Sequence, residues 1–248
     1  MKTEIESPAA VSSERAIDLL QEGHVELVAQ VLPSSNLIFL TRVSDDELQA
    51  LAIYKPHRGE QPLWDFPHGT LCLREVAAYA VSQALGWPPV PPTVLREGPH
   101  GIGALQLFID ADRESNYFSF QEDRRSDLLP VALFDLVANN ADRKGGHLLL
   151  DRRDRIWAID NALTFHVEPK LRTVIWDFAG QAIPNAYLDD LVRLQGELTV
   201  EGVLCQTLSR LLVGEEIAAL RERLMGLLEA RVFPQPDPDR RQVPWPLV

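Results

Sequence analysis

The polar residues that could carry chemistry gather in the stretch NNADRKGGHLLLDRRDRIWAID, which runs from Asn139 to Asp160. Asp142, Lys144 and His147 follow one another there in the order D-x-K-x-x-H, on a glycine-containing loop between a predicted helix and a predicted strand. Asp160 ends the second strand of a predicted short hairpin. Loops that a rigid framework positions often carry functional side chains, so we expect the two carboxylates to face a common site.

Two carboxylates and a lysine are the parts that phosphoryl transfer from ATP requires. The protein mainly positions the reactants and neutralises charge in this reaction. One carboxylate orients the attacking hydroxyl, another holds Mg²⁺, and a lysine covers the phosphates. Other common chemistries lack their signatures, because the sequence has no G-x-x-x-x-G-K-[ST], G-x-S-x-G or H-E-x-x-H motif.

The order of predicted strands, helix and loop resembles the protein-kinase-like fold. The segments D-R-K-G-G-H at 142–147 and I-D-N-A at 159–162 resemble the catalytic core of phosphatidylinositol 3- and 4-kinases, which reads D-R-H-x-x-N and then I-D-F-G. The stretches YKPHRGE, WDFP, REVAAY, NNADRKGGH and VEPKLRTVIWDFAG together resemble an actinobacterial family of phosphatidylinositol 3-/4-kinase-like proteins. This likeness extends from about residue 20 to residue 232 and brings no substrate with it.

The resemblance implies a role for each matching residue. Lys55, at the end of the third predicted strand, resembles the lysine that contacts ATP phosphates, and Glu75 on the next helix resembles its ion-pair partner. Asp142 matches the catalytic aspartate, which orients the substrate hydroxyl and accepts its proton. Asp160 matches the aspartate that binds Mg²⁺ or Mn²⁺. Lys144 matches the lysine that helps to neutralise the transferring phosphate in serine/threonine protein kinases.

Two further segments take the places of nucleotide-binding elements. The turn PSSN, which contains Ser34 and Ser35, lies where kinases fold a loop over the phosphates. Its hydroxyls and backbone N–H groups could both donate to phosphate. The strand QLFID, which contains Gln106 and Phe108, takes the place of the hinge that holds adenine through backbone hydrogen bonds. We therefore expect both segments to contact ATP.

Two departures from the kinase pattern bear on activity. His147 stands where kinases usually keep a metal-binding asparagine, and imidazole is a softer Mg²⁺ ligand than an amide or carboxylate oxygen. Asn161 and Ala162 replace the Phe-Gly that usually follows the metal aspartate. These departures leave two alternatives open, a pseudokinase that binds nucleotide or a partner protein without turnover, and nucleotidyl transfer on the same scaffold.

The site residues also have purely structural interpretations. Lys55 could be a solvated strand end, and Glu75 a helix surface residue. Asp142 and Asp160 could form turns. His147 could bond a loop carbonyl instead of contacting metal or phosphate.

Hydrophobic patterning predicts the elements that must position these residues. Three aliphatic segments separated by polar turns predict an antiparallel meander, and two further strands follow a helix expected at 71–85. Beyond residue 112 the chain is mainly helical, apart from the hairpin HLLLD and RIWAID. Helices are expected at about 185–195, 199–213 and 215–232. Five prolines follow residue 232, and Trp245 among them favours a strap that docks on the body.

Composition and net charge limit the classes of partner that we expect this chain to bind. The chain has 248 residues, 46% of them hydrophobic and 24% charged, which is typical of a globular protein of one or two domains. A net charge of −12 argues against nucleic acid, anionic membranes and a lipid acceptor. The sequence shows neither a signal peptide nor a membrane span, and Cys72 and Cys205 lack metal-ligand spacing. We expect a cytoplasmic protein without stable membrane association.

The sequence thus predicts an α+β, two-lobed protein-kinase-like fold, with a small antiparallel sheet in the first lobe and a mainly helical second lobe. Residues 1–110 would form the nucleotide-binding lobe, 111–232 the lobe with the catalytic loop and metal site, and 233–248 an extended proline-rich tail. The predicted activity is ATP- and Mg²⁺-dependent transfer of phosphate to a hydroxyl of a protein or small molecule. The residues specify neither the substrate nor the oligomeric state.

Overall fold

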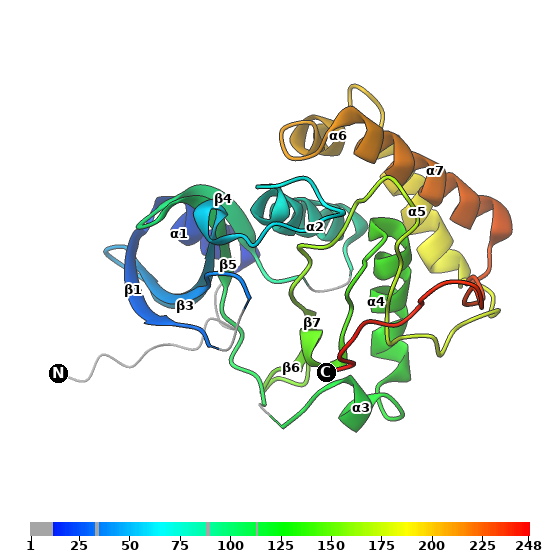
Figure 1. Ribbon diagram of the computed structural model, residues 1–248, viewed down its shortest axis with the longest axis horizontal. Coiled ribbons are helices and arrows are strands. Elements are labelled where there is room, and N and C mark those ends of the chain that lie inside the picture. The colour runs from blue at the N-terminus through cyan, green and yellow to red at the C-terminus, as the bar shows by residue number, and fades with distance from the viewer. Residues whose placement is uncertain (1–11, 33–34, 88–89, 113) are drawn as a thin grey trace.

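The computed structural model describes residues 12–32, 35–87, 90–112 and 114–248, and it shows an α+β fold of two lobes (Figure 1). The smaller lobe is built on a five-stranded antiparallel sheet with the strand order β1-β2-β3-β5-β4. Its elements are α1 (Ser13–Glu22), β1 (His24–Gln30), β2 (Phe39–Ser44), β3 (Gln49–Pro56), a 3-10 turn (His57–Gly59), α2 (Leu71–Leu85), β4 (Thr93–Gly98) and β5 (Gly101–Leu107). The predicted three-strand meander and the helix at 71–85 are confirmed.

Alternation along β3 decides which way Lys55 points. Ala52 and Tyr54 are buried and pack with residues of α1, including Leu19 and Leu20, on one face of the sheet. Successive side chains of a strand point to opposite faces. Lys55 therefore lies on the face away from α1.

The larger lobe follows β5 and is mainly helical, as predicted. Its elements are α3 (Tyr117–Phe120), α4 (Arg125–Ala138), a 3-10 turn (Gly145–His147), β6 (Leu148–Leu150), β7 (Ile156–Ala158), α5 (Asn185–Glu197), α6 (Val203–Leu208) and α7 (Gly214–Ala230). The predicted hairpin is β6 paired with β7. Two details differ from the sequence prediction: α3 was not expected, and α6 is shorter than the helix predicted at 199–213, because tight turns precede Gly202.

The core of the larger lobe includes one face of α2. Ala77, Ala78, Val81 and Leu85 of α2 belong to the same buried cluster as the helices α4, α5 and α7. Trp87 packs against this cluster, and its Nε1 donates to a carboxylate oxygen of Asp190 on α5 at 2.8 Å. Helix α2, which precedes residue 110, is thus fixed to helices that follow this residue. The division of the chain into two lobes at residue 110 therefore stays a prediction.

The proline-rich tail docks on the larger lobe, but not through Trp245. The carbonyl of Gln242 accepts from Thr173 N at 3.1 Å, and the carbonyl of Leu247 accepts from Gly145 N at 2.7 Å. Pro244 is buried, whereas Trp245 is 76% exposed, so the prediction that the tryptophan anchors the tail is wrong. Figure 1 shows the tail in red, passing from α7 across α4 to end beside β6 and β7.

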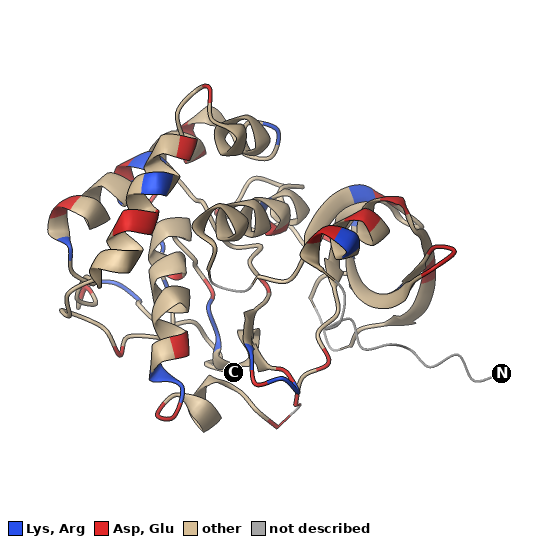
Figure 2. Ribbon diagram, turned by 180° about the vertical axis from the view of Figure 1, so that it is seen from behind, with Lys and Arg blue, Asp and Glu red and all other residues tan. Residues whose placement is uncertain are grey.

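Acidic and basic residues are mixed over both lobes, as Figure 2 shows. Across the described ranges no helix combines the length and apolar character needed to cross a bilayer. Both cysteines are free thiols, with Cys72 buried and Cys205 partly buried.

Candidate nucleotide and catalytic site

Three of the predicted site residues meet between the lobes, although they come from distant parts of the chain. The Lys55 Nζ of β3 donates to a carboxylate oxygen of Glu75 on α2, and it lies 3.0 Å from Asp160 Oδ1, just beyond β7. Glu75 is buried, with only 1% of its side chain exposed. Its second oxygen accepts from the backbone N–H of Asn161 at 3.1 Å, so both oxygens are hydrogen-bonded.

The charges of this cluster reinforce one another. Burial disfavours the Lys55 ammonium, but the carboxylates of Asp160 and Glu75 outweigh it and raise the lysine pKa above its ordinary value. The Lys55 ammonium in turn holds the pKa of Asp160 well below its usual range. Lys55 is therefore a cation and Asp160 an anion at neutral pH, as the binding of phosphate and of a divalent cation would require.

Asp160 has an unusual backbone conformation that the surrounding residues stabilise. Its φ is +56°, in the left-handed region that costs an L-residue about 1–2 kcal/mol. The peptide groups on both sides are held, because Arg143 Nη1 donates to the Ile159 carbonyl at 2.7 Å and Glu75 accepts from Asn161 N. This conformation directs the Asp160 carboxylate toward Lys55 and His147.

The loop after α4 presents Asp142 and Lys144 together. The Lys144 Nζ lies 3.2 Å from Asp142 Oδ2, and about a quarter of each side chain is exposed. Burial raises the pKa of Asp142 above its ordinary value, and Lys144 opposes that shift. Asn140 fixes the loop, since its Oδ1 accepts from Asp142 N at 3.0 Å and its Nδ2 donates to Asp135 Oδ1 at 3.0 Å. Asn140 thus positions Asp142.

His147 lies between Lys144 and Asp160. Its Nε2 is 3.3 Å from Asp160 Oδ2, and its Nδ1 accepts from Lys144 N at 3.4 Å. Burial lowers the pKa of the imidazole to about 4, although the Asp160 carboxylate opposes this, so the ring is neutral at pH 7. A neutral ring that accepts at Nδ1 carries its proton on Nε2, the nitrogen that faces Asp160.

A buried network that the sequence interpretation missed holds this loop in place. Asp135 of α4 and Arg143 are both fully buried, with Arg143 Nη2 at 3.1 Å from Asp135 Oδ1. Arg143 also donates to Asn161 Oδ1 at 2.6 Å, and Thr173 Oγ1 donates to Asp135 Oδ2 at 3.1 Å. The signal was present in the sequence, because a single aspartate in the apolar run LLPVALFDLVA requires a buried partner.

The residues of the predicted adenine-binding strand form hydrogen bonds within the sheet. Gln106 pairs with strands on both sides, with Ile53 in β3 and Thr93 in β4, and its buried side chain donates to Thr93 Oγ1 at 2.9 Å. The N–H of Phe108 donates to the Leu51 carbonyl at 3.0 Å. β5 ends at Leu107, earlier than the predicted strand, and a contact between this segment and adenine stays a prediction.

Of the two serines expected over the phosphates, Ser34 lies outside the described residues. Ser35 is exposed. The turn is tied to the loop after β3, since Leu37 N donates to the Gly59 carbonyl at 2.9 Å and the Asn36 side chain accepts from Gln61 N at 2.8 Å. A contact between Ser35 and phosphate stays a prediction.

The donor atoms near Asp160 fit a divalent cation that takes only some of its ligands from the protein and others from phosphate oxygens. Among the described residues, no cluster of three or more His, Cys, Asp or Glu side chains could hold a metal alone. Asp160 Oδ2 and His147 Nε2 form a pair only. Mg²⁺ is usually bound by one or two carboxylates together with substrate phosphates and water, so Asp160 suits it, while the imidazole is a less suitable ligand.

The β-rich lobe, the helix α2 and the mainly helical lobe are arranged as in a kinase-like fold. The solved structure of the Helicobacter pylori proinflammatory kinase CtkA superimposes with a TM-score of 0.50, covering 86% of this chain and 94% of that chain. The two sequences are 12% identical, so the likeness concerns the fold. The predicted two-lobed kinase-like fold is thus confirmed.

Sequence comparison places the chain in a family. It is 36% identical over 264 residues to Protein Rv2133c of Mycobacterium tuberculosis (strain ATCC 25618 / H37Rv), a match that covers 92% of this chain and 94% of that protein. The chain belongs to the family of this mycobacterial protein. No family model matches the chain, so the finer likeness to phosphatidylinositol 3- and 4-kinases rests on the quoted motifs.

Proposed function

We propose that this chain is a cytoplasmic phosphotransferase that uses ATP with Mg²⁺ or Mn²⁺ and acts on a hydroxyl of a protein or small molecule. The observation that carries this proposal is the meeting of Lys55 with Glu75 and Asp160. A strand lysine, a helix glutamate and a turn aspartate are brought together from segments up to 105 residues apart in sequence. A solvated strand end or a simple turn former would not require such a meeting.

The residues divide the work of the reaction as follows. Lys55, held by Glu75, would bind the phosphates of ATP. Asp142 would accept the proton of the acceptor hydroxyl as its oxygen bonds to the γ-phosphorus, while the bond from that phosphorus to the β-γ bridging oxygen breaks and ADP leaves. Lys144 would neutralise charge on the transferring group.

The cation-binding part of the proposal rests on the carboxylate of Asp160. A bound Mg²⁺ supplies charge neutralisation at the phosphate oxygens. Asp160 would hold it through oxygen, and His147 would orient this carboxylate through its Nε2 proton. The raised pKa of Asp142 makes the carboxyl a better proton acceptor than an ordinary aspartate, although a larger fraction is protonated in mildly acidic solution.

The acceptor is better described as a soluble hydroxyl compound or protein than as a lipid. The resemblance of the motifs to phosphatidylinositol kinases suggests a lipid, but the net charge of −12 disfavours approach to anionic head groups. We therefore propose the kinase chemistry of that group without its lipid substrate.

A second candidate function is nucleotide binding without turnover. The observation that favours it is that both oxygens of Asp160 already have partners, Lys55 at Oδ1 and His147 at Oδ2. A cation would have to share or displace these contacts. Asn161, in place of the usual phenylalanine, is also committed to Arg143 and Glu75. The measurements below separate the two functions.

Nucleotide binding is tested by the melting temperature of the protein with ATP and Mg²⁺ or Mn²⁺. A ligand of the native state stabilises it by mass action, so we expect both metal-nucleotide pairs to raise the melting temperature of the wild type. We expect Asp160→Ala to lose the metal-dependent part of the shift. Asp189→Ala, at an exposed position of α5, is the matched control and should respond like the wild type. No shift in the wild type would refute the site.

Turnover is tested by phosphate release and autophosphorylation from ATP, followed in the wild type and Asp142→Asn. We expect a loss of about 10²–10⁴-fold in the variant, which is the usual contribution of a positioned base. Equal slow rates would refute the role of Asp142 and favour the nucleotide-binding function. The mass of any modified product separates phosphoryl from nucleotidyl transfer.

A further inference from the structure

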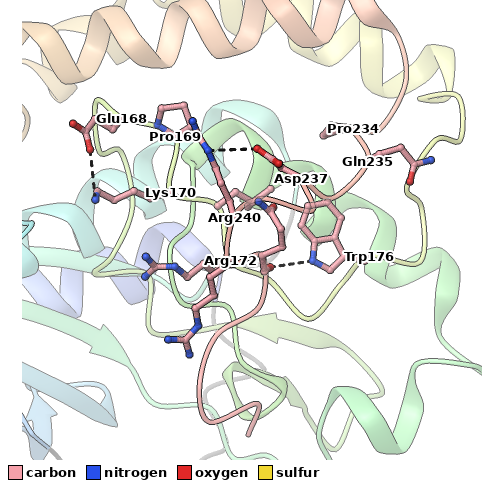
Figure 3. Close-up of a pocket in the computed structure, with 12 residues that line it drawn as sticks. Glu168, Pro169, Lys170, Arg172, Trp176, Pro234, Gln235, Asp237 and Arg240 are labelled. Atoms are coloured by element: carbon pink, nitrogen blue, oxygen red, sulfur yellow. Dashed lines mark hydrogen bonds and ion pairs between the residues drawn. The ribbon is translucent and has the colours of Figure 1, made fainter.

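A pocket of about 730 Å³ opens between two segments of the larger lobe, apart from the site described above. Residues 168–176, which follow Asp160 in the chain, form one wall, and residues 234–242 of the tail form the other (Figure 3). It shares no lining residue with the Lys55, Asp142 and Asp160 cluster. Its volume lies within the range typical of small-molecule sites.

The charge of this pocket is opposite to that of the chain. The protein carries a net charge of −12, yet basic side chains outnumber acidic ones in the lining. The basic residues are Lys170, Arg172, Arg240 and Arg241, and the acidic ones are Glu168 and Asp237. A local excess of positive charge in a concave site favours an anionic ligand.

Two of these cations are uncompensated. Lys170 Nζ lies 3.2 Å from Asp65 Oδ2, and Arg240 Nε lies 3.4 Å from Asp237 Oδ2. Within the described ranges, neither Arg172 nor Arg241 has a carboxylate oxygen within 4.0 Å of its guanidinium nitrogens. The Nε of Arg241 donates to the Val243 carbonyl at 3.0 Å, so this guanidinium is anchored to the tail without a carboxylate. A guanidinium presents its donors in a planar fork that matches phosphate oxygens, so two guanidinium groups without a carboxylate partner suit two phosphoryl groups.

The pocket also has a fixed aromatic wall. Trp176 Nε1 donates to the Gln242 carbonyl at 3.1 Å, which holds the indole against the tail, as the dashed line in Figure 3 marks. An aromatic face beside basic side chains can pack on a planar or apolar part of a ligand. The lining thus combines anion recognition with a contact surface for an organic group.

We propose that this pocket binds a soluble small molecule that carries two phosphoryl groups, held by Arg172 and Arg241. The proposal does not depend on the kinase activity, because the pocket and the Lys55 site share no residue. It has a structural consequence, since Arg172 N donates to the Asn140 carbonyl at 2.8 Å and Arg143 N donates to the Arg172 carbonyl at 2.9 Å. A ligand on Arg172 therefore stabilises the tail and the catalytic loop in their docked arrangement.

The test uses inorganic pyrophosphate as the probe, with the full chain in buffer that contains EDTA. Removal of divalent cations suppresses binding at the metal-dependent nucleotide site. Sodium chloride of equal ionic strength is the reference, because general screening also changes stability. At a hundredfold excess over the dissociation constant, we expect the melting temperature to rise by roughly 5–10 °C relative to this reference.

Four variants locate the binding site. Arg241→Gln changes an exposed side chain, so this variant should fold. Arg172→Gln changes a half-buried side chain. We expect each to weaken the apparent affinity for pyrophosphate by about tenfold or more, the usual value of a charge-assisted pair. Arg210→Gln, at an exposed arginine remote from the pocket, should leave the affinity unchanged. Lys55→Met should keep the pyrophosphate shift, because the candidate nucleotide site is elsewhere.

Three results would overturn the proposal. One is the absence of any pyrophosphate shift beyond that of the salt reference. Another is an equal shift in the wild type, Arg172→Gln and Arg241→Gln. The third is binding to vesicles of phosphatidylcholine and phosphatidic acid that requires Arg172 and Arg241, without binding of pyrophosphate. In that case the phosphoryl groups belong to a lipid surface. Failure of ATP and Mg²⁺ to bind would refute the kinase proposal alone.

Discussion

The buried pair Asp135 and Arg143 should be among the most sensitive points of the molecule. Both side chains are fully buried, and Arg143 reaches Asp135 through Nε and Nη2 at 3.1 to 3.2 Å. Asp135→Asn removes the negative charge and leaves the guanidinium buried without it. Removing one partner of a buried ion pair typically costs about 3–5 kcal/mol, because the remaining charge keeps its desolvation penalty. Total stability is roughly 5–15 kcal/mol, so the loss would be large.

Urea unfolding at pH 7 measures this cost. We expect the free energy of unfolding of Asp135→Asn to fall by about 3–5 kcal/mol, with an unchanged denaturant slope. Asp127→Asn is the matched control in the same helix, because Asp127 is 46% exposed and lies 3.5 Å from Arg124. An exposed pair of this kind contributes at most about 1 kcal/mol.

A double-mutant cycle tests the physical reason. Asp135→Leu combined with Arg143→Met removes both charges, so the double variant should be more stable than the sum of the single losses predicts. We expect a coupling energy of about 1–3 kcal/mol between the two positions. Additive losses, or a cost below about 1 kcal/mol for Asp135→Asn, would show that the pair does not organise the catalytic loop as we infer.

Two further predictions concern the tail contact and the thiols. Gly145→Ala should cost roughly 1–3 kcal/mol in urea unfolding, because its Cβ would lie 2.8 Å from the Phe118 ring, whereas Gly146→Ala would meet only ordinary contacts and should be nearly neutral. Burial raises the pKa of Cys72 to about 12, so a thiol reagent at pH 8 should modify Cys205 first and Cys72 only on unfolding, as mass spectrometry can show. The raised pKa of Cys72 means that folding favours its neutral thiol. The thiol's contribution to the free energy of unfolding is therefore fully present below pH 9 and declines as the pH rises from 9 towards 12. Rapid native modification of Cys72, or equal costs at the two glycines, would contradict these expectations.

The parts of the site that lie on regular elements could be predicted from the sequence. The alternation of Ala50, Ala52 and Tyr54 sets β3 and therefore the side of the sheet on which Lys55 lies. The helix that carries Glu75 ends at Gly86, whose φ of +75° is the left-handed conformation that glycine readily adopts. Such signals are local, so the chain itself displays them.

The remaining parts depend on pairings that no local pattern displays. The left-handed conformation of Asp160 is set by contacts from Arg143 and Glu75, which are remote in sequence. The N–H of Phe108 is occupied because it donates to the Leu51 carbonyl of β3, a strand far away in sequence. The tail docks through backbone groups and Pro244, whereas sequence reasoning chose the larger apolar residue, Trp245. In each case a tertiary contact decides the outcome.

The position of Glu75 is governed by the larger lobe more than by the sheet. Its neighbour Arg74 is fully buried and pairs with Glu216 of α7, and Arg74 Nη1 donates to the Thr164 carbonyl at 2.6 Å. Moving α2 away from the larger lobe would separate this pair and expose the apolar face that α2 contributes to the core. Breaking one buried pair costs about 3–5 kcal/mol, which would leave a displaced state populated at less than about one per cent. The larger lobe therefore holds Glu75 in place, and we expect any control of the proposed activity to act on the nucleotide, the acceptor or the tail rather than on this helix.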